Sequence, residues 1–468
     1  MIDELDYAEI LPQVEALHAR CVSILRECKM WNDERPIEGL HRYTNSLTAE
    51  MHFIEKLLEN PSLIKKEHIQ STNLSYLEAV YEALSGVGKY KNEVMRMVSG
   101  PLDNNVWMPR AAMLKNSSVK VDIVSENGLV WVKVIARNAK AFRHEIMGLE
   151  WDDSDSSDDD DDEEYQDGPK KASAVGDFDS LPIFKKAHEY LRTARAHHVQ
   201  FHTPIVVFAF MRIQPEQDVF VQKIMDRLTE IGIVVHMQQP IKSPLQLRST
   251  YMPFLKDIQD IDHITTPSIN VDVSSALAIL SELSHHVCSP EQISAMPLQV
   301  QAEREARIPA LPQIRHYITG KKLCIITSAY ERLKEIVDIV GGDNEKARFR
   351  YLFRSHLHLD LEFDAELWTI LPSLSIEIIP DALSEAFTKL LEPPFDHKSK
   401  LNNGRKIRTR FSEFHAKIFG SGAHYKMTTL TAIQWMETAL KDAGLEGQFL
   451  VSHEPRSLAE RKMHIIKE

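Results

Sequence analysis

Short apolar runs alternate with amphipathic stretches from residue 203 to residue 451, and this alternation constrains the fold more than any other feature. The runs are TPIVVFAFM (203–211), IVVHM (233–237), SINV (268–271), KKLCIITS (321–328), LSIEIIP (374–380), KMTTL (426–430) and GQFLV (447–451). Apolar runs of this length predict buried strands, and the periodicity between them is that of helices. Strands that alternate with helices predict parallel sheets, which bind ligands at the carboxyl ends of the strands.

The N-terminal part of the chain follows a different pattern. Its first hundred residues have helical periodicity, whereas SVKVDIV (118–124) and LVWVKVIA (129–136) flank a turn and predict an antiparallel hairpin. Asp122 and Lys133 in this hairpin have a spacing similar to that of restriction nucleases, but Trp131 stands where such a site needs a second carboxylate. An ordinary half-buried hairpin is the favoured interpretation.

These patterns predict an α/β protein, and its 468 residues leave room for two or three domains. The predicted segments are a helical N-terminal region (1–110), a β-hairpin region (111–150), an acidic disordered loop (151–175), a βαβ region (176–262) and a C-terminal domain with a parallel sheet flanked by helices (263–468).

The net charge of -13 comes almost entirely from one segment. Residues 150–167 contain twelve of the 68 Asp and Glu residues and no Lys or Arg, so the rest of the chain is nearly neutral. Like-charge repulsion and a lack of apolar residues predict a solvated, disordered spacer. An alternative is that the segment imitates a polyphosphate and covers a basic surface of the same chain.

The cysteines and the hydropathy pattern indicate the compartment. The four cysteines have the spacing of neither a disulfide framework nor a zinc site, which favours a reducing compartment. The acidic N-terminus does not resemble a secretory signal, and no apolar run is long enough to span a membrane. We therefore expect a cytosolic or nuclear protein that is not bound to membranes.

Asp272 is the residue with the most informative position. It follows the predicted strand SINV and precedes the apolar helix VSSALAIL, with Ser274 nearby. Asp is a preferred N-cap residue, so the side chain need do no more than begin a helix. At the edge of a parallel sheet it can also hold Mg²⁺, provided that other oxygen ligands converge there. The sequence alone leaves both interpretations open.

Several segments of the chain resemble one protein family. They are NVDVSSALAILSELSH (270–285), QAEREARIPAL (301–311), IVDIVGG (336–342), IFGSGAHYKMTTLTA (418–432) and VSHEPRSL (451–458), together with GLVWVKVIARN (128–138) and TPIVVFAF (203–210). Their order and spacing resemble a eukaryotic family defined by the domain of unknown function 1308, whose C-terminal part is grouped with PIN-like nucleases.

The resemblance implies a metal-dependent nuclease site. A PIN-like sheet of about five parallel strands gathers acidic residues around one or two Mg²⁺ or Mn²⁺ ions, which activate water for phosphodiester hydrolysis. Asp272 matches the first ligand, Ser274 would orient it, and Glu303 matches the second ligand, with Glu305 as the alternative. Glu303 and Glu305 are two residues apart on a helix, so at most one of them reaches the site.

Two positions depart from the family pattern. Ala423 stands where the family carries an Asp after Phe-Gly-Thr-Gly, and Ile433 stands where a polar residue is expected. Neither side chain can bind a metal, so we expect weak metal binding and nuclease activity that is residual or lost. The sequence does not tell whether Ala423 is natural or introduced.

A basic stretch supports an interaction with nucleic acid. The cations of residues 397–420 that we expect to contact phosphates are Arg405, Lys406, Arg408, Arg410 and Lys417. Phe411 and Phe414 lie among them and could stack on bases, although a solvated loop has the same composition. The leading prediction is a degenerate PIN-like protein that binds RNA or other nucleic acid, with single-stranded RNA as the candidate partner. The alternative is a non-catalytic scaffold for protein partners, and an active nuclease remains a third hypothesis.

Overall fold

The computed structural model divides the chain into two compact units. One unit comprises Met1–His197 and Thr203–Asp262, and the other comprises His198–His202 and His263–Glu468. The residues that it describes are 4–59, 72–87, 91–99, 118–146, 181–214, 218–237, 246–258, 261, 263–368, 374–382, 384–391, 411–442 and 447–463.

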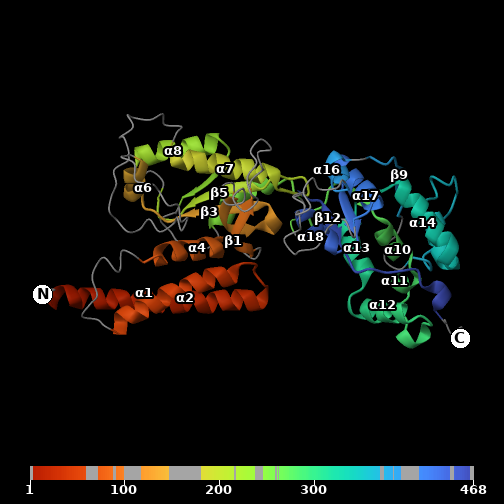
Figure 1. The fold of residues 1–468 in the computed structure, drawn as a ribbon, viewed down its shortest axis with the longest axis horizontal. Helices are drawn as coiled ribbons and strands as arrows, with labels where there is room; N and C mark the ends of the chain where they lie inside the picture. The colour runs from red at the N-terminus through yellow and green to blue at the C-terminus, as the bar shows by residue number, and fades with distance from the viewer. Residues whose placement is uncertain are drawn as a thin grey trace. The chain divides into compact units, whose positions relative to one another are not determined.

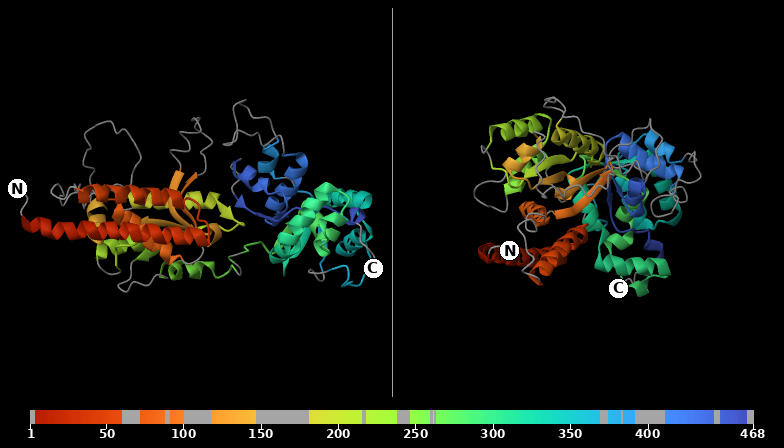
Figure 2. Two further views of the ribbon diagram at one scale, coloured as in Figure 1. Left: turned by 90° about the horizontal axis from the view of Figure 1, so that it is seen from below. Right: turned by 60° about the vertical axis from the view of Figure 1, so that its left-hand side comes forward.

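The first unit begins with three helices, α1 (Glu4–Glu34), α2 (Leu40–Glu59) and α4 (Leu74–Gly86). Helices α1 and α2 lie side by side (Figure 1, Figure 2). Tyr43 of α2 is buried and its hydroxyl donates a 2.7 Å hydrogen bond to the carbonyl of Leu77 in α4. Burial also raises the pKa of the Cys21 thiol to about 11, so this cysteine of α1 is an inert core residue.

A mixed sheet forms the centre of the first unit. Its strands, in spatial order, are β1 (Lys91–Ser99), β2 (Ser118–Ser125), β3 (Val130–Ile135), β5 (Ile205–Phe210) and β6 (Val234–Met237). β1, β2 and β3 are antiparallel neighbours, whereas β3, β5 and β6 run parallel. The predicted hairpin and the βαβ unit, with α8 (Val219–Glu230) as its helix, are therefore present.

Strand β1 differs from the sequence-based expectation. It lies in the stretch with predicted helical periodicity, yet it pairs antiparallel with β2 from Lys91 to Ser99. Val94 and Val98 are buried while Met97 is exposed, which is the pattern of an edge strand with one buried face. Pairing with β2 outweighs the helical preference of the Lys, Glu and Met residues in this segment.

The Asp122–Lys133 pair of the hairpin is a buried structural contact. The Lys133 ammonium lies 3.3 Å from Asp122 Oδ2. Asp122 also accepts hydrogen bonds from the Tyr76 hydroxyl and from the backbone N–H of Val134, both at 2.6 Å. Trp131 is buried in the core. The arrangement agrees with the hairpin interpretation, because this carboxylate already has three protein partners.

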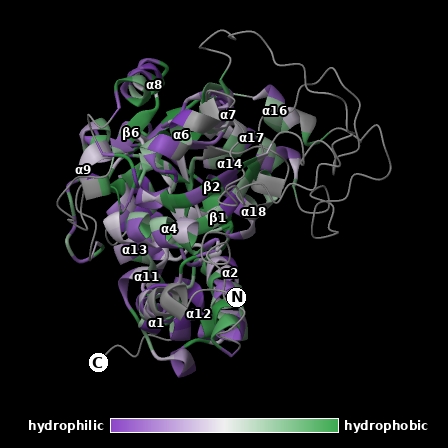
Figure 3. Ribbon diagram, turned by 90° about the vertical axis from the view of Figure 1, so that its left-hand side faces the viewer, coloured by the Kyte–Doolittle hydropathy of each residue, from purple (hydrophilic) through white to green (hydrophobic). Residues whose placement is uncertain are grey.

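Helices surround the mixed sheet. They are α6 (Ala139–Ile146), α7 (Pro182–Ala196), α8 and α9 (Gln246–Tyr251), with short 3₁₀ turns at Glu126–Gly128 and Met252–Leu255. Phe184, Ala187, Tyr190 and Ala194 form the buried face of α7 and meet Phe208 of β5 in one apolar core. Figure 3 shows hydrophilic and hydrophobic residues alternating along helices such as α8, as amphipathic packing requires.

A parallel sheet forms the centre of the second unit. Its strands are β7 (Ser268–Val271), β8 (Lys322–Ile326), β9 (Ile376–Ile379), β10 (Thr428–Thr431) and β12 (Leu450–Ser452), in the spatial order β12-β10-β7-β8-β9. A two-stranded pair, β4 (His198–Val199) with β11 (Gly447–Gln448), accompanies it. The strand order reverses between β7 and β10, and such a switch point is where open parallel sheets bind ligands.

Helices flank this parallel sheet, as predicted. They are α10 (Val273–Leu280), α11 (Glu282–His285), α12 (Met296–Arg307), α13 (Ala310–Ile318), α14 (Thr327–Val340), α15 (Asp343–Leu352), α16 (Glu385–Lys389), α17 (Glu413–His424) and α18 (Trp435–Asp442), with 3₁₀ turns at Pro290–Gln292 and Glu460–Lys462. Buried residues of β7, β8, β10 and most of these helices form one apolar core, whereas Leu283 of α11 and Ala302 of α12 belong to a second, smaller cluster with Ile293, Ala459 and Met463. No helix among the described residues combines the length and the apolar character that crossing a membrane requires.

Residues 453–463 form a segment that we call the C-terminal strap. Arg456 of the strap pairs with Glu305 at the end of α12. The backbone N–H groups of Ala459 and Glu460 donate to the carboxylate of Glu345 on α15, and the N–H of Ser294 donates to the Lys462 carbonyl. The strap therefore holds α12 and α15 through buried polar contacts.

Candidate functional site at the edge of the C-terminal sheet

Asp272 is a helix cap that also joins two strands. It stands between β7 and α10 and is 2% exposed. Its Oδ1 accepts a 2.7 Å hydrogen bond from the Ser274 N–H, which is the N-cap contact of α10. Its Oδ2 accepts from the Ser274 hydroxyl at 2.8 Å and from the hydroxyl of Thr431, the last residue of β10. The side chain thus links the ends of β7 and β10 at the switch point.

The two hydroxyls that contact Asp272 extend this link to the loop after β10. Ser274 Oγ accepts a 2.8 Å hydrogen bond from the N–H of Ala432, and Thr431 Oγ1 accepts a 3.1 Å bond from the N–H of Ile433. We refer to Asp272, Ser274 and Thr431 as the Asp272 latch. Ser274 lies where the family resemblance places an orienting residue, and it fixes both the carboxylate and the loop.

Burial also affects the charge of Asp272. Loss of hydration raises the pKa of this carboxyl, although the hydrogen bonds from Thr431 and Ser274 and the nearby His415 act in the opposite direction. A carboxylate must be deprotonated to bind a metal, and three of its acceptor positions already have protein donors. Both features make Asp272 a poor ligand for Mg²⁺.

The other predicted ligands do not join Asp272 in a metal site. Glu303 is exposed on α12. Glu305 is completely buried, where its carboxylate pairs with the guanidinium of Arg456 and accepts from the Ala310 N–H at 3.1 and 3.2 Å. It therefore caps α13 and neutralises a buried cation. These contacts leave Glu305 unavailable to a metal ion.

The two residues that depart from the family pattern, Ala423 and Ile433, have apolar side chains that cannot bind a metal. Ala423 and Ile433 both pack against the apolar core of the unit. Throughout the described residues, no group of three or more His, Cys, Asp and Glu side chains is placed to hold a metal ion. The residues present therefore do not fit the divalent metal centre that the family resemblance implies.

Most of the predicted basic segment lies outside the described residues, as does the acidic segment. This applies to Arg405, Lys406, Arg408 and Arg410 and to residues 151–175. Lys417 lies on α17, where its ammonium is 3.3 Å from Glu413 one turn earlier. Phe411 is buried in the core and Phe414 packs against it. The nucleic-acid contacts of these cations stay a prediction, and the two rings serve the core.

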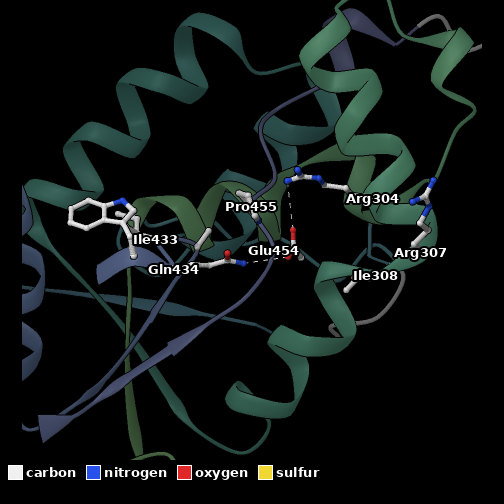
Figure 4. A pocket seen from close by; sticks show the side chains of 9 residues that line it. Arg304, Arg307, Ile308, Ile433, Gln434, Glu454 and Pro455 are labelled. Carbon is white, nitrogen blue, oxygen red and sulfur yellow. Dashed lines mark hydrogen bonds and ion pairs between the residues drawn. The ribbon is translucent and has the colours of Figure 1, made fainter. Parts of the chain in front are cut away.

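A pocket that we did not predict lies beside the Asp272 latch. Three segments line it: the end of α12 with Arg304, Arg307 and Ile308, the loop 432–435 after β10, and Glu454 with Pro455 after β12 (Figure 4). The latch holds the N–H groups of Ala432 and Ile433, so it positions one wall of this pocket.

The pocket carries an excess of positive charge. Arg304 Nη1 lies 4.0 Å from Glu454 Oε2, and Gln434 Nε2 donates a 3.3 Å hydrogen bond to Glu454 Oε1. Arg307 also lines the pocket and forms no ion pair with any described residue, but Figure 4 shows its side chain directed away from Glu454, so Arg304 alone faces this carboxylate. Trp435 adds an aromatic side chain to the lining and meets the His415 ring edge-on at 5.8 Å. Such a lining suits an anionic ligand that also carries a planar or apolar group.

The sequence contained a signal for this pocket. Arg304 and Arg307 belong to the QAEREAR segment and are three residues apart, so they share one face of α12. Gln434 and Trp435 follow a strand at the sheet's ligand-binding edge. The segment QAEREAR therefore contributes its arginines, and not its carboxylates, to the pocket lining.

Replacement of Asp272 by alanine is expected to lower the free energy of unfolding of the C-terminal unit by about 2 kcal/mol, because a cap and two buried hydroxyl contacts disappear. Hydrogen–deuterium exchange of the α10 and 432–435 peptides would measure the loss. Glu303→Ala, an exposed carboxylate of the same unit, is the control. If Asp272→Ala, like the control, left the exchange rates unchanged with or without Mn²⁺, the structural role assigned to Asp272 would be rejected.

Comparisons with known proteins identify two families in the chain. Residues 269–366 match the family described as protein of unknown function (DUF1308), and this range includes Asp272, α12 and both arginines. Residues 16–165 match a family of unknown function, DUF5614, and this range covers most of α1, the helices α2 and α4, and the strands β1 to β3. No solved structure matches the chain. The chain thus contains one stretch similar to DUF1308 in its C-terminal unit and one similar to DUF5614 in its N-terminal part, both of them families of unknown function.

Proposed function

We propose that the C-terminal unit is a degenerate PIN-like domain that binds single-stranded RNA and does not cleave it. The observation that carries this proposal is the pocket of Arg304, Arg307 and Trp435 beside the switch point of the parallel sheet. A nuclease fold that has lost its metal ligands can retain its nucleic-acid surface, because phosphate binding depends on cations and not on the reacting groups.

The pocket offers the three kinds of contact that single strands use. Guanidinium groups bind phosphate oxygens with directed hydrogen bonds. An aromatic ring such as that of Trp435 gives a base a stacking surface of little sequence preference. Ile308 and Pro455 add apolar area to the lining. The ligand class that uses all three is a nucleotide within a single strand.

The lack of cleavage follows from the state of the carboxylates. Asp272 is buried and bonded to Ser274 and Thr431, and Glu305 is paired with Arg456. Ala423 and Ile433 supply hydrocarbon at the remaining positions. We therefore expect RNA to bind equally well with Mg²⁺, with Mn²⁺ and with EDTA, and to remain uncut in all three.

The double substitution Arg304→Glu/Arg307→Glu is expected to weaken the binding of single-stranded RNA roughly 100-fold at low salt, because two phosphate contacts become repulsive. Fluorescence anisotropy with a labelled oligonucleotide and the full chain measures the affinity, and a salt titration measures the number of phosphate contacts.

The matched control for this test is Arg332→Glu/Lys334→Glu on α14. It makes the same change in net charge, and the Arg332 side chain is 59% exposed against 58% for Arg304. Only the pocket variant should lose affinity. An equal loss in both variants would reveal unspecific attraction and reject the pocket as the RNA site.

A protein-binding scaffold is the second candidate function, and α12 supplies the observation in its favour. Met296 is 77% exposed, and Val300 and Ile308 are exposed on the same helix. Exposed apolar side chains on one helix often mark a protein-binding face. If the arginine variant kept its RNA affinity, or if neither chain bound RNA, this candidate would take the place of the first.

A further inference from the structure

The backbone at Glu454 is held between two buried side chains. His453 Nδ1 contacts the Glu454 carbonyl at 2.8 Å and Nε2 contacts Ser275 Oγ at 2.7 Å. Burial lowers the pKa of His453 to about 4, so the ring is neutral near pH 7. A carbonyl can only accept, so Nδ1 donates and Nε2 accepts from Ser275. Together with the buried Arg456 beyond Pro455, this histidine fixes where the Glu454 side chain begins.

The Glu454 carboxylate presents one uncommitted oxygen to the pocket. Oε1 accepts from Gln434 Nε2 at 3.3 Å. Oε2 accepts no hydrogen bond from any described residue and lies 4.0 Å from Arg304 Nη1, which is too far for a hydrogen bond. Figure 4 shows Glu454 facing both Arg304 and Gln434. The pocket thus contains a carboxylate oxygen that accepts no hydrogen bond and lies directly beside the cation with which it forms an ion pair.

A free carboxylate beside a phosphate site needs a ligand with two different features. A phosphate bound to Arg304 would be repelled by Glu454, since like charges at close range are unfavourable. A hydrogen-bond donor next to that phosphate offsets the repulsion by bonding to Oε2. Ribonucleotides provide this pair, because the 2′-hydroxyl stands on the carbon next to the 3′-phosphate. Deoxyribonucleotides have only hydrogen at that carbon.

We propose that Glu454 selects RNA over DNA by accepting a hydrogen bond from the ribose 2′-hydroxyl of the nucleotide whose phosphate lies on Arg304. This inference rests on the RNA-binding function proposed above. Carboxylates recognise ribose hydroxyls in nucleotide sites of other parallel-sheet proteins, and the 2′-hydroxyl is the group that distinguishes the two nucleic acids. Glu454 then determines specificity, whereas the arginines supply affinity.

The test compares three labelled single strands of one sequence, made of RNA, DNA and 2′-O-methyl RNA, on the full chain. We expect the wild type to bind RNA about tenfold more tightly than either of the others, which is the scale of one hydrogen bond to a charged group. In Glu454→Ala the preference should disappear, because RNA loses a bond and DNA loses a repulsion. Glu335→Ala, which removes the partner of Arg332, should keep the wild-type preference.

The outcomes separate this inference from the function on which it rests. Equal wild-type affinity for RNA and 2′-O-methyl RNA would overturn the role of the 2′-hydroxyl while RNA binding stands, and this measurement needs no variant. A Glu454→Ala chain that binds all three strands more tightly but still prefers RNA would also overturn it, because Glu454 would then act by charge alone. If the double variant Arg304→Glu/Arg307→Glu bound RNA as tightly as the wild type, the proposed function itself would be rejected.

Discussion

Replacement of Glu345 by alanine is expected to lower the free energy of unfolding of the C-terminal unit by about 4 kcal/mol, among the largest effects of any single substitution in this unit. Glu345 is fully buried at the third position of α15. Its Oε1 accepts from the N–H groups of Glu282, Ala459 and Glu460 at 3.0, 2.8 and 3.2 Å, and its Oε2 accepts from the Gly342 N–H at 3.0 Å. The alanine variant leaves four buried donors without acceptors.

Hydrogen–deuterium exchange resolved by peptide is the appropriate measurement, because it reports on one unit of a two-unit chain. Faster exchange should concentrate in the C-terminal strap and at the start of α15. Glu345→Gln should lose less stability, because its amide oxygen can still accept hydrogen bonds from the N–H groups of Glu282, Ala459 and Glu460. Glu335→Ala, which removes a carboxylate that is exposed on α14, is the control. If the strap of the Glu345→Ala variant exchanged as slowly as that of the wild type, the role of Glu345 in holding the strap would be contradicted.

The strands of both sheets could be predicted because their information is local. Runs such as IVVFAF and KLCII are buried on both faces, so a continuous apolar sequence is sufficient to recognise them. Glu345 illustrates what local patterns do not contain. Its donors come from α11, the turn before α15 and the C-terminal strap, and its sequence neighbourhood resembles the exposed face of any charged helix. Only the assembled fold shows that it is buried.

The site was predicted in part, for the same reason. The family resemblance implied that Ser274 orients Asp272, and the Ser274 hydroxyl does donate a hydrogen bond to this carboxylate. The partner that completes the latch, Thr431, is more than 150 residues away in sequence. For Glu303 and Glu305, the sequence could not tell which carboxylate faces inward, because that depends on where Arg456 lies. The family resemblance favoured Glu303, which is the exposed residue of the two.

The buried acidic residues of this unit hold the segments that line the pocket. Asp272 holds the loop after β10 through Ser274 and Thr431, and that loop supplies Gln434 and Trp435 to the pocket. Glu305 holds the end of α12 to the strap, and these segments supply the arginines and Glu454. Each buried carboxylate is next to a pocket wall and positions it.

The second large effect is expected for the ion pair between Glu305 and Arg456. Arg456→Ala should lower the free energy of unfolding of the C-terminal unit by about 3 to 5 kcal/mol, because it leaves the Glu305 charge buried without a partner. It also removes the 2.9 Å hydrogen bond from Arg456 Nη2 to the Ile308 carbonyl. Urea denaturation monitored by exchange of the α12 and strap peptides measures the loss.

The double variant Glu305→Met/Arg456→Met distinguishes this mechanism from simple loss of packing. Apolar side chains of similar length remove both buried charges together, so the double variant should be more stable than Arg456→Ala. A double variant at least as unstable as the single one would contradict the proposed cost of the unpaired charge.

The same pair links stability to binding, since Glu305 adjoins Arg304 in sequence and Arg456 follows Glu454 and Pro455. Separation of α12 from the strap moves two walls of the pocket apart. We therefore expect Arg456→Ala to weaken RNA binding even at temperatures where the unit remains folded, whereas the double methionine variant should retain most of the affinity. If the single variant bound RNA as tightly as the wild type, the pocket would not depend on this ion pair for its shape.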